Sequence, residues 1–255
     1  MSVVVAERAD DERILLIKLD RPEARNAVNG QVAREMAAVL DELDTDPTLR
    51  LAILYGEGRG FSAGMDLKGF LEGDFPEFED RGFGGFASKP PRKPLIAAVE
   101  GFAVAGGLEM ALACDLIVAA RDAKLGLPEV KRSLIAAGGG LLRLAQRIPY
   151  HVAMELALTG DPVPAERLYQ VGLLNRLCGP GQALDEALAL ASAIVGNAPL
   201  GLEGSKHVMA NAADWGLADG WDRQQEVARR IMNSEDAREG ATAFAERRAP
   251  VWQGR

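Results

Sequence analysis

The sequence predicts a mixed α/β fold whose last third is helical, and three observations lead to that prediction. Short apolar runs alternate with helix-length segments over residues 14–120, which is typical of β-α-β units with strands covered on both faces. From residue 138 onward, helical patterns follow one another almost without interruption. Hydrophobic residues make up 48% of the 255 residues and charged residues 26%, the profile of a globular protein with one sizeable core.

Four apolar runs predict the strands of the first half. They are residues 14–20 (ILLIKLD), 49–56 (LRLAILYG), 94–101 (PLIAAVEG) and 115–120 (DLIVAA). Between the first two runs, residues 30–43 carry apolar side chains at helical spacing, so we expect a helix there. A further helix-length segment separates the last two runs.

The second half of the chain carries the helical patterns. They cover residues 139–148, 151–158, 164–170, 183–196, 199–212, 217–232 and 235–248, with one candidate strand in LLNRLC (173–178). We therefore expect two regions: a β/α core over residues 1–195 that holds the functional site, and a helical region over residues 196–255.

One interval, residues 69–94, has no regular pattern and holds five of the eight phenylalanines of the chain. Long irregular segments in compact domains are usually functional or mobile. Aromatic side chains on such a loop favour a lid or the wall of an apolar pocket. The alternative is a surface loop whose phenylalanines merely pack down onto the core.

Composition argues against several classes of function. The net charge of −8 disfavours nucleic-acid binding, which needs a basic surface, and no stretch of about 18 apolar residues predicts a membrane span. Two cysteines in apolar surroundings and an N-terminus without the layout of a signal peptide favour a cytoplasmic protein with reduced thiols. His151 and His207 are isolated, so we expect no metal site.

Two glycine turns combine a strand end with a helix start: GRGFSAGMDLKGF (58–70) and EGFAVAGGLEMALACD (100–115). The first N–H groups of a helix have no partner within it and carry the positive end of its dipole, so they suit a developing oxyanion. The second turn also carries Glu109 in an apolar run, where an unpaired carboxylate is costly. A third motif, KLGLPEVKRSLIAAGGG (124–140), supplies Glu129, which an intervening strand could return to the same pocket.

These motifs, in this order, resemble the crotonase (enoyl-CoA hydratase/isomerase) superfamily over nearly the whole chain. LDRPEARNAVN (19–29), NAPLGLEGSKHVM (197–209) and GATAFAERR (240–248) extend the match. The resemblance implies an α/β fold with a crotonase-like ββα spiral core and a helical C-terminal trimerisation region. It implies that residues 196–255 make oligomer contacts in a homotrimer or dimer of trimers.

The resemblance also implies a catalytic set of four residues. The oxyanion N–H donors fall on Met65 and Gly106, and the two hydratase carboxylates on Glu109 and Glu129. Such a site adds water across the C2=C3 bond of a 2-enoyl-CoA thioester. We assign the main proton transfer to Glu129 and the orientation of water to Glu109.

An acyl-CoA substrate needs contacts for its coenzyme A portion, which is part of the substrate, and no separate cofactor is expected. By resemblance, the contacts fall on Ala24, Arg25, Ala63, Met65, Asp66, Leu67, Lys68 and Gly106, with Phe244 and Arg247 contributed by a neighbouring subunit. For Arg25 and Lys68 the alternative is that they are ordinary solvated charges.

The chain departs from the family pattern in SLIAAGGGLL (133–142). Ser133, Ala136 and Ala137 stand where hydratases of the family often have a Gly, a Pro and a Gly. Alanine adds a methyl group and restricts the backbone, so the departure bears on substrate choice more than on reaction class. Three alternatives to a hydratase therefore stay open: a carnitinyl-CoA-type dehydratase, an enoyl-CoA isomerase, and a non-catalytic acyl-CoA-binding protein.

Overall fold

The computed structural model describes residues 2–10 and 12–255, and its core is a six-stranded sheet in the order β1-β2-β3-β4-β6-β9. The strands are β1 (Val4–Ala9), β2 (Ile14–Leu19), β3 (Leu51–Gly56), β4 (Leu95–Val99), β6 (Leu116–Ala120) and β9 (Arg176–Cys178). Only β1 pairs antiparallel; the other neighbours in this sheet are parallel. The predicted mixed α/β fold with strands from all four apolar runs is confirmed.

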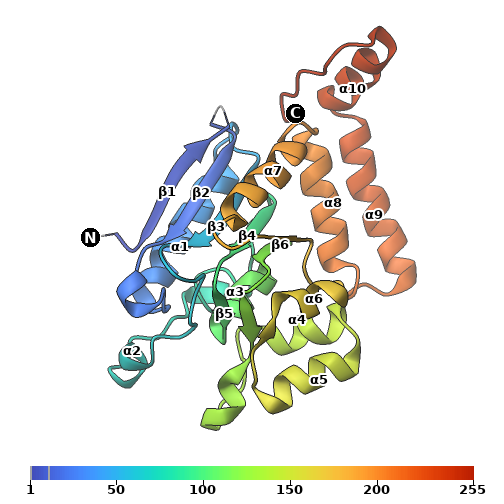
Figure 1. Ribbon diagram of the computed structural model, residues 1–255. Helices are drawn as coiled ribbons and strands as arrows, with labels where there is room; N and C mark the ends of the chain where they lie inside the picture. The colour runs from blue at the N-terminus through green and yellow to red at the C-terminus, as the bar shows by residue number, and fades with distance from the viewer. Residues whose placement is uncertain (1, 11) are drawn as a thin grey trace.

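A second, three-stranded sheet lies beside the first (Figure 1) and was not predicted from the sequence. It consists of β5 (Phe102–Val104), β7 (Lys124–Gly126) and β8 (Val163–Pro164). β5 and β7 pair in parallel, whereas β7 and β8 pair antiparallel. Strands of two or three residues are too short to show alternation, so the pattern of apolar residues does not reveal them.

The eight helices for which the sequence predicts bounds, α1 and α4 to α10, follow the predicted segments to within two residues at each end. They are α1 (Gly30–Thr45), α2 (Leu67–Leu71), α3 (Gly106–Ala113), α4 (Gly140–Arg147), α5 (Tyr150–Thr159), α6 (Ala165–Gln170), α7 (Ala183–Val195), α8 (Pro199–Asn211), α9 (Leu217–Met232) and α10 (Glu235–Glu246). Three 3₁₀ turns, η1 (Pro22–Ala24), η2 (Glu79–Arg81) and η3 (Pro128–Arg132), complete the chain.

Both faces of the larger sheet are buried, which explains why its strands are continuous apolar runs. One face packs against α1 and α3. The other is covered by α7, which presents Ala183, Ala187 and Ala191 at every fourth position to Ile53 and Ile96 of the sheet. Small side chains at this spacing let the helix lie close to the strands.

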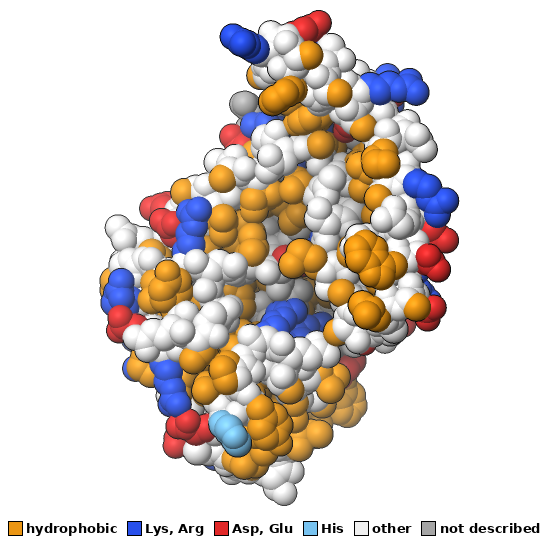
Figure 2. Space-filling model, turned by 90° about the vertical axis from the view of Figure 1, so that its right-hand side faces the viewer, with side chains coloured by type: hydrophobic (Ala, Val, Ile, Leu, Met, Phe, Trp, Pro, Cys, Tyr) orange, Lys and Arg blue, Asp and Glu red, His pale blue; other side chains and the backbone are white. Residues whose placement is uncertain are grey.

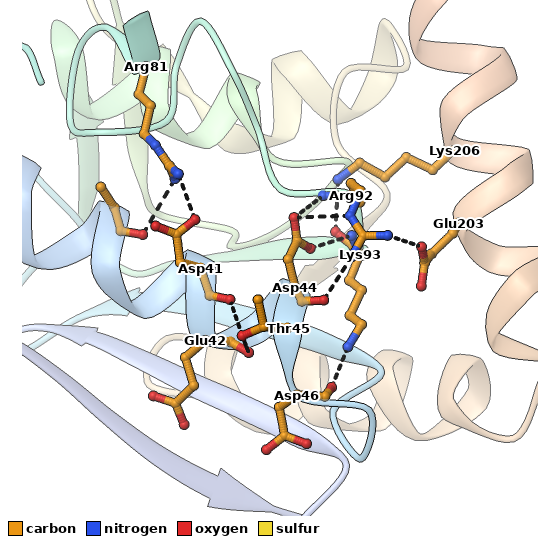
Figure 3. A network of polar contacts seen from close by, with 11 residues as sticks. Asp41, Glu42, Asp44, Thr45, Asp46, Arg81, Arg92, Lys93, Glu203 and Lys206 are labelled. Atoms are coloured by element: carbon orange, nitrogen blue, oxygen red, sulfur yellow. Dashed lines mark hydrogen bonds and ion pairs between the residues drawn. The ribbon is translucent and has the colours of Figure 1, made fainter. Parts of the chain in front are cut away.

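The last three helices project beyond α7, with α8 and α9 side by side and α10 at the far end (Figure 1). A polar network fixes α8 to the core (Figure 3). Arg92 pairs with Glu203 of α8 at 3.0 Å, and Nζ of Lys206 lies 2.6 Å from the carboxylate of Asp115. Lys206 also donates to the carbonyl of Lys93 at 2.9 Å, and its side chain is only 12% exposed.

Among the described residues no single helix is long and apolar enough to cross a membrane; α7 and α8 meet the length and composition requirement only as a pair, and that pair is bent by 109°.

Removing the ammonium group of Lys206 should destabilise the protein. Lys206→Met leaves Asp115 without its cation and the carbonyl of Lys93 without a donor, so we expect a loss of about 1–3 kcal/mol in the free energy of unfolding, measured with urea. The control is Lys89→Met, because the pair of Lys89 with Asp80 is solvent-exposed and should contribute less than about 0.5 kcal/mol. Equal losses in the two variants would contradict a structural role for Lys206.

Candidate active site

The backbone N–H of Met65 points away from the strand-like segment beside it. Met65 pairs in parallel with Val28, and that bridge uses the flanking residues: Val28 donates to the carbonyl of Gly64, and Asp66 donates to the carbonyl of Val28, both at 2.8 Å. Since successive N–H groups of an extended chain point to opposite sides, the N–H of Met65 faces the other way. Among the described residues it finds no acceptor.

The second N–H group belongs to Gly106, the first residue of α3. Ala105 precedes it with a φ of 53°, and helix geometry leaves the Gly106 N–H without an intrahelical partner. No described residue accepts it. A Cβ on Gly64 would lie 2.7 Å from the nitrogen of Gly106, so the two glycine turns are in direct contact. Two N–H donors therefore stand on adjoining backbone segments.

Glu109 lies in the first turn of α3 and is almost fully buried, with 3% of its surface exposed. Its Oε1 accepts the N–H of Gly140 at 2.9 Å. A Cβ on Gly138 would lie 2.8 Å from Oε2, and a Cβ on Gly140 would lie 2.9 Å from Cγ. The turn 138–140 thus wraps around the carboxylate, and only glycine fits at its two ends.

Glu129 reaches the same edge of the small sheet from the neighbouring strand. β5 and β7 pair in parallel, with Val104 opposite Gly126, and the N–H of Ala105 donates to the carbonyl of Gly126 at 3.0 Å. Parallel strands end at a common edge, so α3 after β5 and η3 after β7 begin side by side. Oε2 of Glu129 is buried and has no hydrogen-bond partner within the described chain, an uncommon state that is typical of functional sites.

Burial raises the pKa of both carboxyls, and the charge of Glu129 acts on Glu109. The pKa of Glu109 is raised to about 7, chiefly by burial, while the N–H of Gly140 opposes the rise and the charge of Glu129 adds to it. Burial also raises the pKa of Glu129, with Arg132 acting against it. The negative charge of Glu129 therefore adds to the effect of burial in favouring the protonated form of Glu109.

The segments predicted to bind coenzyme A lie next to each other. The carbonyl of Arg25 accepts the N–H of Ala63 at 3.0 Å, which brings Ala24 and Arg25 beside the Met65 segment. Leu67 and Lys68 follow at the start of α2 with exposed side chains. Whether these residues contact coenzyme A stays a prediction.

Asp66 has a clear structural task at this place. Its carboxylate caps α2 by accepting the N–H groups of Lys68 and Gly69, and it pairs with Arg21 at 3.0 Å. These contacts lower the pKa of Asp66 against the effect of burial. Asp66 therefore holds the shape of the segment that presents Met65.

The two residues expected from a neighbouring subunit are not near this site within one chain. Phe244 and Arg247 belong to α10 and its C-terminal cap, and α10 lies at the opposite end of the molecule from α2 (Figure 1). Phe244 is 88% exposed.

The sequence indicated a lid or pocket wall in the Phe-rich interval but did not single out Phe83, which lies at the site. It comes from the interval 69–94, where Phe70 and Phe75 are exposed and stack edge to face, whereas Phe83 and Phe86 are buried. The aromatic content of the interval drew attention to the loop, but no periodicity separates the buried phenylalanines from the exposed ones.

A groove of about 1080 Å³ opens on the face formed by α4, α8 and α9. Figure 2 shows this hollow with basic side chains inside it and hydrophobic side chains around it. The groove reaches Ala137, Gly138 and Gly139, the outer side of the turn that holds Glu109, and Arg143 and Arg147 of α4 line it. Within the described chain there is no group of three potential metal ligands.

Comparison with known proteins identifies the family of this chain. The family model for enoyl-CoA hydratase/isomerase matches residues 9–255. The chain belongs to the enoyl-CoA hydratase/isomerase family, and the predicted crotonase resemblance is confirmed.

Two solved structures and one further relative are similar to this chain over 95% or more of its length. A crystal structure of an enoyl-CoA hydratase from Mycobacterium tuberculosis H37Rv is 53% identical, with full coverage of both chains and a TM-score of 0.97. A carnitinyl-CoA hydratase structure from Mycobacterium avium is 41% identical, again with full coverage of both chains, and has a TM-score of 0.79. A carnitinyl-CoA dehydratase of Proteus mirabilis is 38% identical over 251 residues, 95% of each chain.

The raised pKa of Glu109 should make stability depend on pH. An unfolded chain releases this proton near pH 4.5 and the folded chain near 7, so the folded state binds more protons in between and stability falls as pH rises through that window. We expect Glu109→Gln to lack this fall and to gain about 3 kcal/mol relative to the wild type between pH 4 and pH 8. Urea unfolding of both proteins at the two pH values measures the difference; parallel pH profiles would contradict the assignment.

Proposed function

We propose that the protein is an enoyl-CoA hydratase that adds water across the C2=C3 bond of a 2-enoyl-CoA thioester. The observation that carries the proposal is the meeting of four groups at one sheet edge: the unpartnered N–H groups of Met65 and Gly106, the buried carboxyl of Glu109, and the half-buried Glu129 with its buried Oε2. The relatives named as enoyl-CoA hydratases and carnitinyl-CoA dehydratases support a hydro-lyase.

In this proposal the thioester oxygen lies between the N–H groups of Met65 and Gly106. Both donors polarise the carbonyl and become more favourable as negative charge develops on the oxygen in the enolate-like transition state. Gly106 adds the positive end of the α3 dipole. Since both donors belong to backbone held by neighbouring strands, they need little rearrangement during the reaction.

The two glutamates hold a water against C3 and move its protons. One carboxylate accepts a proton from the water while the other carboxyl delivers a proton to C2. We assign proton transfer chiefly to Glu129, because its Oε2 is not engaged by the chain, and orientation of water to Glu109, because Gly140 fixes its Oε1. Coenzyme A enters only as part of the substrate, and the chemistry proposed here requires no separate cofactor.

Loss of either carboxylate should reduce turnover strongly. General acid or base groups contribute about 100- to 10,000-fold, so Glu129→Gln and Glu109→Gln should each lower kcat on crotonyl-CoA by at least about 100-fold. The measurement is the loss of enoyl-thioester absorbance. The control is Glu35→Gln, because Glu35 also accepts N–H groups, from Val3 and Val4, but lies on α1 away from the site. Undiminished hydration by Glu129→Gln would refute its role.

A second candidate is dehydration of carnitinyl-CoA or a similar polar hydroxyacyl-CoA, which uses the same groups in the reverse direction. The relatives at 38–41% identity favour it, whereas the relative at 53% identity and the higher TM-score favour a plain enoyl-CoA hydratase. Comparing kcat/KM for crotonyl-CoA and carnitinyl-CoA decides between them. Binding of both thioesters without turnover would instead support a non-catalytic acyl-CoA-binding protein.

We also propose a homotrimer or dimer of trimers in the cytoplasm, with residues 196–255 in the subunit contacts. Leu217, Trp221 and Phe244 of α9 and α10 are 86%, 60% and 88% exposed, more apolar surface than isolated helices usually present to water. Light scattering should give three or six times the mass of the chain. A monomer at micromolar concentration would refute the assembly.

A further inference from the structure

Phe83 lies between the Gly106 backbone, which presents an oxyanion donor, and the turn 138–140, which holds Glu109. A Cβ on Gly106 would lie 2.2 Å from Cζ of Phe83 and 2.6 Å from Cε1, so the tip of the ring touches the backbone that presents one oxyanion donor. On the other side, a Cβ on Gly138 would lie 3.1 Å from Cβ of Phe83 and 2.8 Å from Oε2 of Glu109. The side chain therefore borders both an N–H donor and the turn around a carboxylate.

The position of Phe83 is fixed from both sides of its loop. Phe83 pairs with Glu77 in an isolated antiparallel bridge, and its carbonyl accepts the N–H of Ala87 at 3.1 Å. The guanidinium of Arg143 donates to the carbonyl of Ala87 and to that of Gly138, which joins the Phe83 loop to the Glu109 turn. With 7% of its surface exposed, the side chain is packed against its neighbours.

A rigid ring at this place limits the acyl group of the substrate. The thioester oxygen lies at Gly106 and the reacting water lies at Glu109, so C2 and C3 of the acyl group lie between them. We propose that Phe83 is the specificity-determining residue that favours acyl groups unbranched at C2 and C3 over their methyl-branched analogues. The inference rests on the proposed acyl-CoA site, and it concerns only which acyl groups fit.

Shortening Phe83 should relax this selectivity. One methyl group in a close-fitting apolar pocket is worth about 10- to 200-fold, so Phe83→Leu and Phe83→Ala should raise kcat/KM for 2-methylcrotonyl-CoA relative to crotonyl-CoA by at least about tenfold. The control is Phe86→Leu, which shortens a fully buried phenylalanine of the same loop whose ring is not among the nearest neighbours of Gly106 or Gly138. Its selectivity should stay within about threefold of the wild type. Phe83→Leu keeps the experiment decisive if the larger truncation to alanine fails to fold.

A binding measurement separates this inference from the proposed reaction. The ratio of Kd values for butyryl-CoA and 2-methylbutyryl-CoA needs no turnover, and it should shift toward the branched thioester in Phe83→Leu but not in Phe86→Leu. An unchanged ratio of both kcat/KM and Kd in the Phe83 variants would overturn the role of Phe83 while leaving the hydratase intact. Shifted Kd ratios in a protein that hydrates nothing would support the role of Phe83 and refute the hydratase. Absence of acyl-CoA binding in the wild type would refute both.

Discussion

The parallel pairing of β5 with β7 is the constraint on which the candidate site depends. Each strand has three residues, and the pairing places Val104 opposite Gly126. Glu109 follows β5 by less than two turns of α3, and Glu129 follows β7 in η3, so a shift of register would separate the two carboxyls. The hydrogen bond from Ala105 to Gly126 extends the pairing to the residue that precedes Gly106. The small sheet therefore controls the geometry although it contributes little of the core.

Burial gives the paired carboxyls their chemical character. An exposed pair would titrate near the ordinary range, whereas desolvation raises the pKa of both Glu109 and Glu129. Glu109 accepts one fixed N–H, and Oε2 of Glu129 accepts none within the described chain. The same enclosure that makes the carboxyls costly to the fold allows one of them to hold a proton near neutral pH, which is what acid and base catalysis on a thioester requires.

Sequence reasoning succeeded where a pattern is local and long, and it failed where the structure depends on distant partners. The helices from α4 to α10 were predicted to within two residues at each end, because each carries apolar side chains at helical spacing. β1 was not predicted, since Glu7 and Arg8 interrupt the apolar run within this edge strand. β5, β7 and β8 consist of too few residues to carry a signal. The site followed the same rule: Glu109 and Glu129 stood out by their motifs, but their approach depends on strands that the sequence did not reveal.

Phe83 could not be found this way, because its importance arises from where an irregular loop comes to lie. Only the glycines that face Phe83 stand out in the sequence. Gly106 and Gly138 have no space for a side chain. A glycine in a motif can thus be required by a side chain that is distant in sequence. Here Gly106 leaves space for the ring of Phe83, which lies 23 positions earlier in the chain.

The departures from the family pattern fall outside the part of the turn that holds Glu109. Ser133 adopts a φ of 58°, a conformation that glycine takes more readily, so the chain tolerates strain at the end of η3. Ala136 is buried and Ala137 lines the groove, whereas glycine remains at Gly138 and Gly140, where a Cβ would meet the carboxylate. The added methyl groups of the two alanines therefore lie outside the two positions that enclose Glu109. The sequence therefore departs from the family pattern at Ala136 and Ala137 and stays glycine at Gly138 and Gly140, where the carboxylate is held.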